Sequence, residues 1–182
     1  LVLAVHIHRP GIPPVGAATL PYTNWFSYEG IASRHGLTMW SEAYWRMLRR
    51  YAELMAHARQ NVFWVPLCQV FSQTKQGLVL DRLRLRRIVK TFTDAGLYFI
   101  EGGHVAHRTS FMAPTHVLAL TEAPATSVQG HADLHAICAQ LRAEIECQGW
   151  RGRWIQHIAD EPVGASAADY RILAGMVRKC LP

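Results

Sequence analysis

Apolar residues recur at helical spacing in four stretches of the chain, and each is bounded by residues that commonly start or stop a helix. Ser41 is the expected N-cap of the first stretch. Gly96 and Gly149 directly follow the second and third, where a C-terminal glycine is common. The pattern therefore predicts helices over residues 42–59, 81–95, 131–148 and 167–180.

Apolar runs of strand length precede these helices. Residues 62–67 and 97–100 have the composition of strands buried on both faces of a parallel sheet, and Pro66 ends the first. Residues 153–160 form a third run, and the aromatic and polar stretch 23–30 is interpreted as a short strand that leads into a binding loop. Strand and helix would then alternate four times, which implies βαβ crossovers and a parallel sheet.

Four β/α units are half of an eight-fold barrel, which takes about 250 residues when complete. With 182 residues, the chain can bury one substantial core. We expect an α/β fold of the parallel (β/α)8 TIM-barrel type, in which residues 19–182 supply about the first four units. Residues 1–9 alternate like a strand before a run of prolines, so residues 1–18 would end a preceding β domain or form a linker.

Composition narrows the class of protein. Half of the residues are hydrophobic and 18% are charged, which indicates a globular chain, and no apolar run reaches the length of a membrane span. The net charge is +6, and the basic residues lie mainly in helix-like stretches such as 82–87, so we expect no nucleic-acid partner.

The four cysteines form no Cys-x-x-Cys pair, which favours core thiols over a zinc ribbon. The start at Leu1 carries no targeting signal and is expected to be a cut end.

Two adjacent carboxylates, Asp160 and Glu161, end the third apolar run, and Pro162 marks where strand pairing must stop. The carboxyl ends of parallel strands carry the chemistry of α/β folds, so we expect both side chains at the rim of a cleft. Carboxylates this close disfavour joint ionisation, which raises one pKa and leaves a proton for general acid catalysis. The alternative is that Asp160 only opens a loop and Glu161 only begins or caps the next helix.

A second polar cluster, from Glu101 to Arg108, follows the strand predicted over residues 97–100. The glycines Gly102 and Gly103 let the backbone approach a ligand closely, and His104 or Arg108 can donate hydrogen bonds to sugar hydroxyls. This cluster is therefore a candidate carbohydrate-binding loop.

Aromatic residues and a long loop complete the candidate site. Trp25 and Tyr28 offer flat apolar faces on which sugar rings stack, although lid packing explains such residues equally well. Residues 109–130 form a loop of the length that is typical of functional lids.

A metal site is an alternative interpretation of the histidines in this sequence. His104 and His107 have a His-x-x-His spacing, and His6 and His8 would share one face of the first strand, as in some metal-dependent barrel hydrolases. No matched second pair of ligands accompanies His104 and His107, and two histidines on an edge strand need no metal. We therefore expect hydroxyl recognition here and keep the metal-dependent hydrolase as an alternative.

Four segments, in order, are similar to those of a known family: residues 23–32 (TNWFSYEGIA), 60–67 (QNVFWVPL), 100–104 (IEGGH) and 158–162 (IADEP). Together they span residues 19–182 and resemble the catalytic domain of glycoside hydrolase family 123. The resemblance implies a β-sandwich followed by a (β/α)8 barrel, and activity as an exo-β-N-acetylgalactosaminidase or a related β-N-acetylhexosaminidase.

The resemblance also implies a mechanism and a partner. The substrate is a carbohydrate with a terminal N-acetylhexosamine, whose own 2-acetamido oxygen attacks the anomeric carbon, so the protein needs no separate nucleophile. We expect no cofactor and no metal. Asp160 would hold the acetamido N–H and stabilise the oxazolinium ion, while Glu161 protonates the leaving oxygen and later activates water. An extracytoplasmic location is slightly favoured by the resemblance alone.

The resemblance also implies roles for the remaining site residues. Trp25 and Trp64 would wall the sugar pocket, and Glu101, His104 and Arg108 would bind sugar hydroxyls. The chain stops after the fourth helix, so we expect the full-length parent to be a glycosidase and this chain to have little activity. A catalytically silent carbohydrate-binding or structural barrel is the other alternative.

Overall fold

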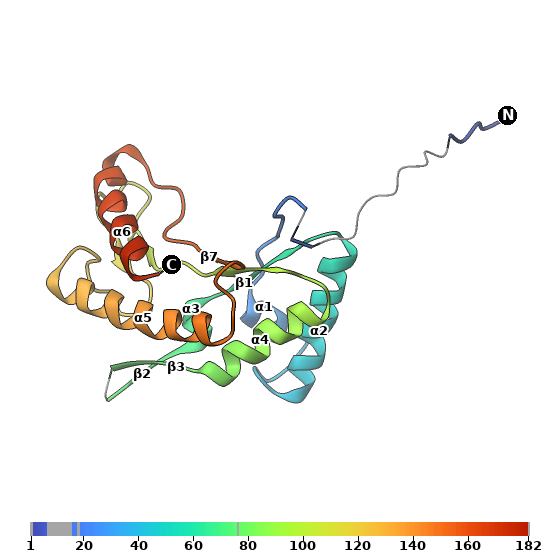
Figure 1. Cartoon of the computed structure of the whole chain (residues 1–182), viewed down its shortest axis with the longest axis horizontal. Helices are drawn as coiled ribbons and strands as arrows, with labels where there is room; N and C mark the ends of the chain where they lie inside the picture. Colours follow the sequence, from blue (N-terminus) through green and yellow to red (C-terminus); the bar gives the residue numbers. More distant parts are fainter. Residues whose placement is uncertain (1, 7–15, 18, 76, 182) are drawn as a thin grey trace.

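A three-stranded parallel sheet is central to the computed structural model, which describes residues 2–6, 16–17, 19–75 and 77–181 (Figure 1). Strand β4 (Phe99–Gly102) lies in the middle, between β1 (Val62–Val65) and β7 (Trp154–Gln156). In the register of this sheet, Glu101 lies beside Trp64 on one neighbour and beside Ile155 on the other. All three strands therefore end at the same edge of the sheet.

Two short antiparallel pairs lie outside this sheet. Strand β2 (Phe71–Thr74) pairs with β3 (Gly77–Leu80), and β5 (Ala106–His107) pairs with β6 (Val117–Leu118). In the first pair, Phe71 and Leu80 are buried while the β2 residues that follow Phe71 are exposed, so apolar residues at its base anchor the pair.

The helices begin where side chains cap them. Ser41 Oγ accepts the Tyr44 N–H at 3.2 Å, and Asp81 Oδ1 accepts the Arg84 N–H at 2.9 Å. The helices are α1 (Tyr28–Arg34), α2 (Glu42–His57), α3 (Leu67–Val70), α4 (Arg82–Asp94), α5 (Val128–Cys147) and α6 (Ala167–Cys180), with a 3-10 turn η1 (Gly164–Ser166) before α6. The helices predicted over 42–59, 81–95, 131–148 and 167–180 are thus confirmed as α2, α4, α5 and α6.

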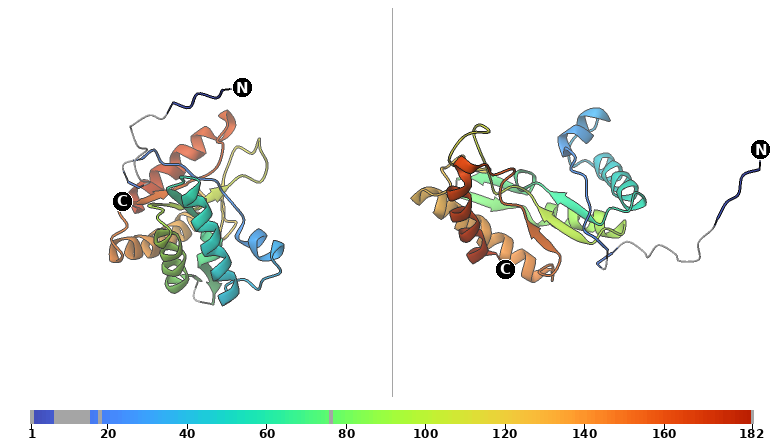
Figure 2. Two further views of the ribbon diagram at one scale, coloured as in Figure 1. Left: turned by 90° about the vertical axis from the view of Figure 1, so that its right-hand side faces the viewer. Right: turned by 90° about the horizontal axis from the view of Figure 1, so that it is seen from above.

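The helices form two groups on either side of the strands. Helices α1 and α2 lie at one end of the structure and α5 and α6 at the other (Figure 2). Helix α2 packs against α4, which in turn packs on β1, where the rings of Phe63 and Phe92 stack with centroids 4.7 Å apart. Buried apolar side chains from both groups belong to one continuous core. That core fixes the sheet and hence the edge at which its strands end.

The expectation of a (β/α)8 TIM-barrel fragment is wrong. Three strands run parallel where four were expected, and the two antiparallel pairs have no place in four consecutive β/α units. The stretch 23–30 forms no strand, because Ser27 Oγ accepts the Gly30 N–H at 2.9 Å and starts α1 there. The polar stretch 72–77 has the composition of a loop, but it belongs largely to the β2–β3 pair.

Other expectations need smaller corrections. Residues 2–6 form no strand, and the rest of the stretch 1–9, including His8, lies outside the described residues. The third strand is shorter than predicted, because β7 ends at Gln156 and Asp160 follows in a loop. The loop 109–130 contains β6 and the start of α5.

The cysteines are free thiols, but they are not all core residues. Cys138 is buried, whereas Cys68 and Cys147 are exposed. None of the helices in the described ranges combines the length and the apolar character needed to cross a bilayer.

Candidate functional site

The carboxyl edge of the parallel sheet carries a cluster of aromatic and ionisable side chains. Trp64 and Glu101 come from β1 and β4, and His104 and His157 directly follow β4 and β7. Trp25, which precedes α1, joins them: its ring centroid lies 5.5 Å from that of Trp64, 5.4 Å from His104 and 5.3 Å from His157. Parallel α/β sheets bind their ligands at this edge.

Glu101 is held in place by two donors. Trp25 Nε1 donates to both carboxylate oxygens, at 3.2 and 3.0 Å, and His157 Nδ1 lies 3.0 Å from Oε1. Burial raises the pKa of the Glu101 carboxyl, but the hydrogen bonds from His157 and Trp25 outweigh it and bring the pKa below its ordinary value. Glu101 is therefore an ionised acceptor that fixes two rings, which differs from the expected role in binding sugar hydroxyls.

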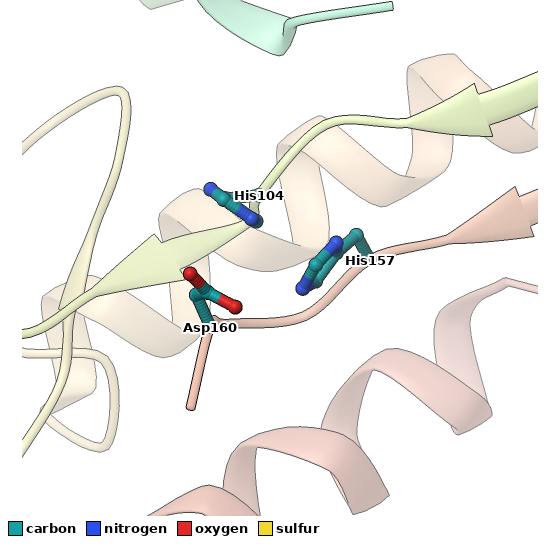
Figure 3. Close-up of side chains that lie close together, drawn as sticks. All are labelled: His104, His157 and Asp160. Carbon is teal, nitrogen blue, oxygen red and sulfur yellow. The ribbon is translucent and has the colours of Figure 1, made fainter. Parts of the chain in front are cut away.

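His104, His157 and Asp160 lie close together. One ligand atom of each, a ring nitrogen or a carboxylate oxygen, is within 4.8 Å of the others, and the three side chains face a common space (Figure 3). The two imidazole rings meet edge to face with centroids 4.1 Å apart. Burial, together with the nearby His157, lowers the pKa of His104, although Asp160 and Glu101 oppose that shift. His104 is therefore a neutral ring near pH 7.

Asp160 and Glu161 are both exposed and line one hollow of about 190 Å³. His104 and Arg108 line the same hollow, so the structure brings four of the expected site residues together. The Arg108 guanidinium donates to the backbone carbonyls of Phe111 and, at 2.6 Å, of Glu161. Arg108 therefore ties the loop after β7 to the loop after β5. Glu161 has a φ of 42°, a left-handed conformation that is uncommon outside glycine.

The aromatic residues divide between the site and the core. Trp25 is 48% exposed and, with Trp64 and Pro66, lines a second hollow of about 410 Å³. Tyr28 is fully buried, and its hydroxyl donates to the carbonyl of Trp64 at 2.8 Å. The expectation that Tyr28 stacks on a sugar is therefore wrong, because both faces of its ring are enclosed in the protein.

Gly102 and Gly103 pack closely against other parts of the protein, whereas a close approach to a ligand was expected. A Cβ on Gly103 would lie 2.8 Å from Cα of Pro66, and one on Gly102 would lie 2.5 Å from side-chain atoms of Trp154 and Gln156. Gly103 N–H donates to the Val65 carbonyl at 2.8 Å. These glycines allow β4 and the segment after it to pack closely between β1 and β7, which brings His104 toward His157.

The histidines do not group as the His-x-x-His spacing suggested. His107 Nε2 lies 3.4 Å from Glu122 Oε2, and within the described part of the chain the set with ligand spacing contains neither His107 nor His6. His8 lies outside the described residues. The partner of His104 is His157, which sequence reasoning gave no role. A signal for it existed, since a polar residue at the carboxyl end of a parallel strand commonly belongs to a site.

Comparisons of the sequence with models of protein families and with curated proteins find no match.

Proposed function

We propose that this protein is a glycoside hydrolase that removes a terminal N-acetylhexosamine from β-glycosides, as an exo-acting β-N-acetylgalactosaminidase or a related β-N-acetylhexosaminidase. One observation carries the proposal: Asp160 and Glu161 line a single hollow together with two donor side chains, His104 and Arg108. The resemblance to glycoside hydrolase family 123 supports the same activity through these two carboxylates.

The geometry also supports sugar binding. Sugar rings combine apolar faces with hydroxyl edges, and Trp25 and Trp64 present aromatic surface in the hollow next to the rings of His104 and His157. The exposed carboxylates of Asp160 and Glu161 and the half-buried Arg108 offer polar partners for hydroxyl groups. A carbohydrate substrate fits this combination better than a purely apolar ligand does.

The proposed reaction uses the acetamido group of the substrate as its nucleophile. The acetamido oxygen forms a bond to the anomeric carbon while the bond to the leaving oxygen breaks, and Glu161 gives its proton to that oxygen. Asp160 accepts the acetamido N–H and offsets the positive charge of the oxazolinium ring. Glu161 then takes a proton from water, which attacks the anomeric carbon and restores the acetamide.

The test is release of nitrophenol from aryl N-acetyl-β-galactosaminide and N-acetyl-β-glucosaminide by the protein expressed from its complete reading frame. Glu161→Gln and Asp160→Asn each remove one proposed catalytic group, and we expect kcat/KM to fall by about 10²- to 10⁴-fold. Glu53→Gln changes an exposed carboxylate on α2 and is the matched control, with an expected rate equal to wild type.

Two outcomes would contradict the proposal. Absence of turnover on both sugars by the wild-type protein would exclude this activity, and sugar binding without turnover would favour the silent carbohydrate-binding alternative. Full activity in Glu161→Gln and Asp160→Asn would show that the hollow they line is not the catalytic site.

A further inference from the structure

We propose that His104, His157 and Asp160 form a binding site for a divalent transition-metal ion such as Zn²⁺, and that Glu101 is the positioning residue that orients His157. This goes beyond the proposed hydrolase activity, which needs no metal. It also differs from the histidine set indicated by sequence spacing, because His157 replaces His107.

The spacing of the ligand atoms fits a cation of this class. Zinc bound at about 2.0–2.1 Å in tetrahedral geometry has its ligand atoms about 3.3 Å from one another. The three atoms here are within 4.8 Å of one another, and Asp160 is an exposed residue in the loop after β7. The upper limit of 4.8 Å exceeds that spacing by about 1.5 Å, so small shifts of the side chains would close the set around an ion.

Glu101 also favours a metal site, because its contact with Nδ1 determines which nitrogen of His157 carries the proton. Its carboxylate accepts from His157 Nδ1 at 3.0 Å, which places the proton on that nitrogen and leaves a lone pair on Nε2. Histidines that bind metals usually donate their other ring N–H to a carboxylate or carbonyl, which holds the ring in place and makes it a better ligand. Trp25 Nε1 in turn fixes Glu101, at 3.0 Å from Oε2.

The donor types decide which ions the site would take. Two imidazoles and one carboxylate suit zinc, copper, nickel and iron, whereas magnesium and calcium prefer sites made of oxygen atoms. Three protein ligands would leave the fourth tetrahedral position open to water or another ligand, and two of the three, Asp160 and His104, also line the hollow. His104 and His157 are preorganised for this role, since their rings pack against each other and against Trp25.

A bound ion would also affect the chemistry of the hollow. If Asp160 coordinates a metal, its carboxylate is not available to hold an acetamido N–H. We therefore expect Zn²⁺ to inhibit the hydrolase, a consequence that rests on the proposed function. The metal site itself does not, because ion binding is measured without any sugar.

Zinc binding by isothermal titration calorimetry, on protein first freed of metal with a chelator, is the test. We expect one ion per chain in the wild type and a loss of affinity of at least about 10-fold in His157→Gln and in Asp160→Asn. The Glu101→Gln variant keeps all three ligands, and its expected loss is about 10- to 100-fold. His107→Gln is the matched control, because it removes a neighbouring histidine outside the set, and its affinity should equal that of the wild type.

Circular dichroism shows whether each variant is folded, and Asp160→Asn tests the site even if a histidine variant unfolds, since Asp160 is exposed. The proposal is overturned if the wild type binds no zinc. It is equally overturned if His107→Gln weakens binding as much as His157→Gln does, because the ion would then be held elsewhere.

Discussion

Two histidine–carboxylate pairs in this molecule have the same local geometry and different surroundings. His157 Nδ1 lies 3.0 Å from Glu101 Oε1 at the edge of the sheet, and His116 Nδ1 lies 2.8 Å from Asp169 Oδ2 beside α6. The His157 side chain is 22% exposed, whereas that of His116 is completely buried. The first pair can meet a ligand, and the second cannot.

The buried pair has a structural role. Asp169 Oδ2 also accepts the backbone N–H of His116 at 2.8 Å, and Oδ1 accepts the Thr126 hydroxyl at 3.1 Å. One carboxylate near the start of α6 thereby holds both ends of the segment 116–126, which contains β6. Within the described residues, the metal-type set that contains His157 has no counterpart around His116.

An unpaired ring nitrogen occurs in both pairs of residues or beside them, and by itself it does not identify a binding site. Nε2 of His104 and Nε2 of His116 are both buried without a hydrogen-bond partner among the described residues. The nitrogen of His116 has no other ligand groups grouped with it, so an unpaired nitrogen alone marks no site. The neighbours of His104, a second imidazole and a carboxylate, distinguish the two places.

Loss of the buried carboxylate gives the largest expected difference between the two pairs. Asp169→Ala leaves the His116 N–H and the Thr126 hydroxyl without their acceptor, so we expect the free energy of unfolding to fall by about 3 kcal/mol. Glu101→Ala should cost about 1 kcal/mol, because Trp25 and His157 are partly exposed and water can replace the carboxylate. Urea denaturation followed by circular dichroism measures both, and equal losses would contradict the assignment of different roles.

Replacing the histidines should separate stability from ligand binding. His116→Gln removes a buried donor to Asp169, and we expect a loss of about 2 kcal/mol in stability with no change in zinc affinity. His157→Gln should change stability by less than about 1 kcal/mol, since its ring is partly exposed, while zinc affinity falls. Denaturation and calorimetry on the same two samples test this, and a zinc defect in His116→Gln would remove the distinction.

The smallest effects concern the one side-chain donor that each carboxylate has besides its histidine among the residues that the structure describes. Thr126→Val removes the hydroxyl that donates to Asp169, and we expect a stability loss of about 1 kcal/mol. Trp25→Phe removes the Nε1–H that donates to Glu101 and keeps an aromatic ring, so stability should stay within about 0.5 kcal/mol of wild type. A larger loss for Trp25→Phe than for Thr126→Val in the same denaturation assay would reverse this order.

Helices and strands could be predicted from the sequence where local capping signals and apolar periodicity agree. Ser41 and Asp81 cap α2 and α4 as their side-chain chemistry requires, and Gly96 and Gly149 have positive φ after α4 and α5. The strand after α2 was also predicted, from its continuous apolar run. These elements depend on residues close to one another in the chain.

Features that depend on distant pairing were missed. The β2–β3 pair has three exposed residues in β2, so its polar sequence is typical of a loop. Tyr28 is buried, and it forms hydrogen bonds with Trp64 and with α2, which are distant from it in the sequence. Glu101 and His157 are 56 residues apart and meet through the alignment of β4 and β7. No local pattern indicates that contact, whereas Asp160 and Glu161 could be proposed from the sequence because they are adjacent in it.

In the proposed reaction, the acetamido group of the substrate acts as nucleophile in the hollow lined by Asp160 and Glu161. The most direct measurement compares kcat/KM for nitrophenyl β-N-acetylgalactosaminides, or for the glucosaminides if those are preferred, in which the acetyl methyl carries zero, one, two or three fluorine atoms. Each fluorine withdraws electron density from the carbonyl oxygen, so we expect a stepwise fall in kcat/KM with fluorine content. Rates that do not depend on fluorine content would show that the acetamido oxygen does not attack, and would contradict the proposed substrate-assisted hydrolysis.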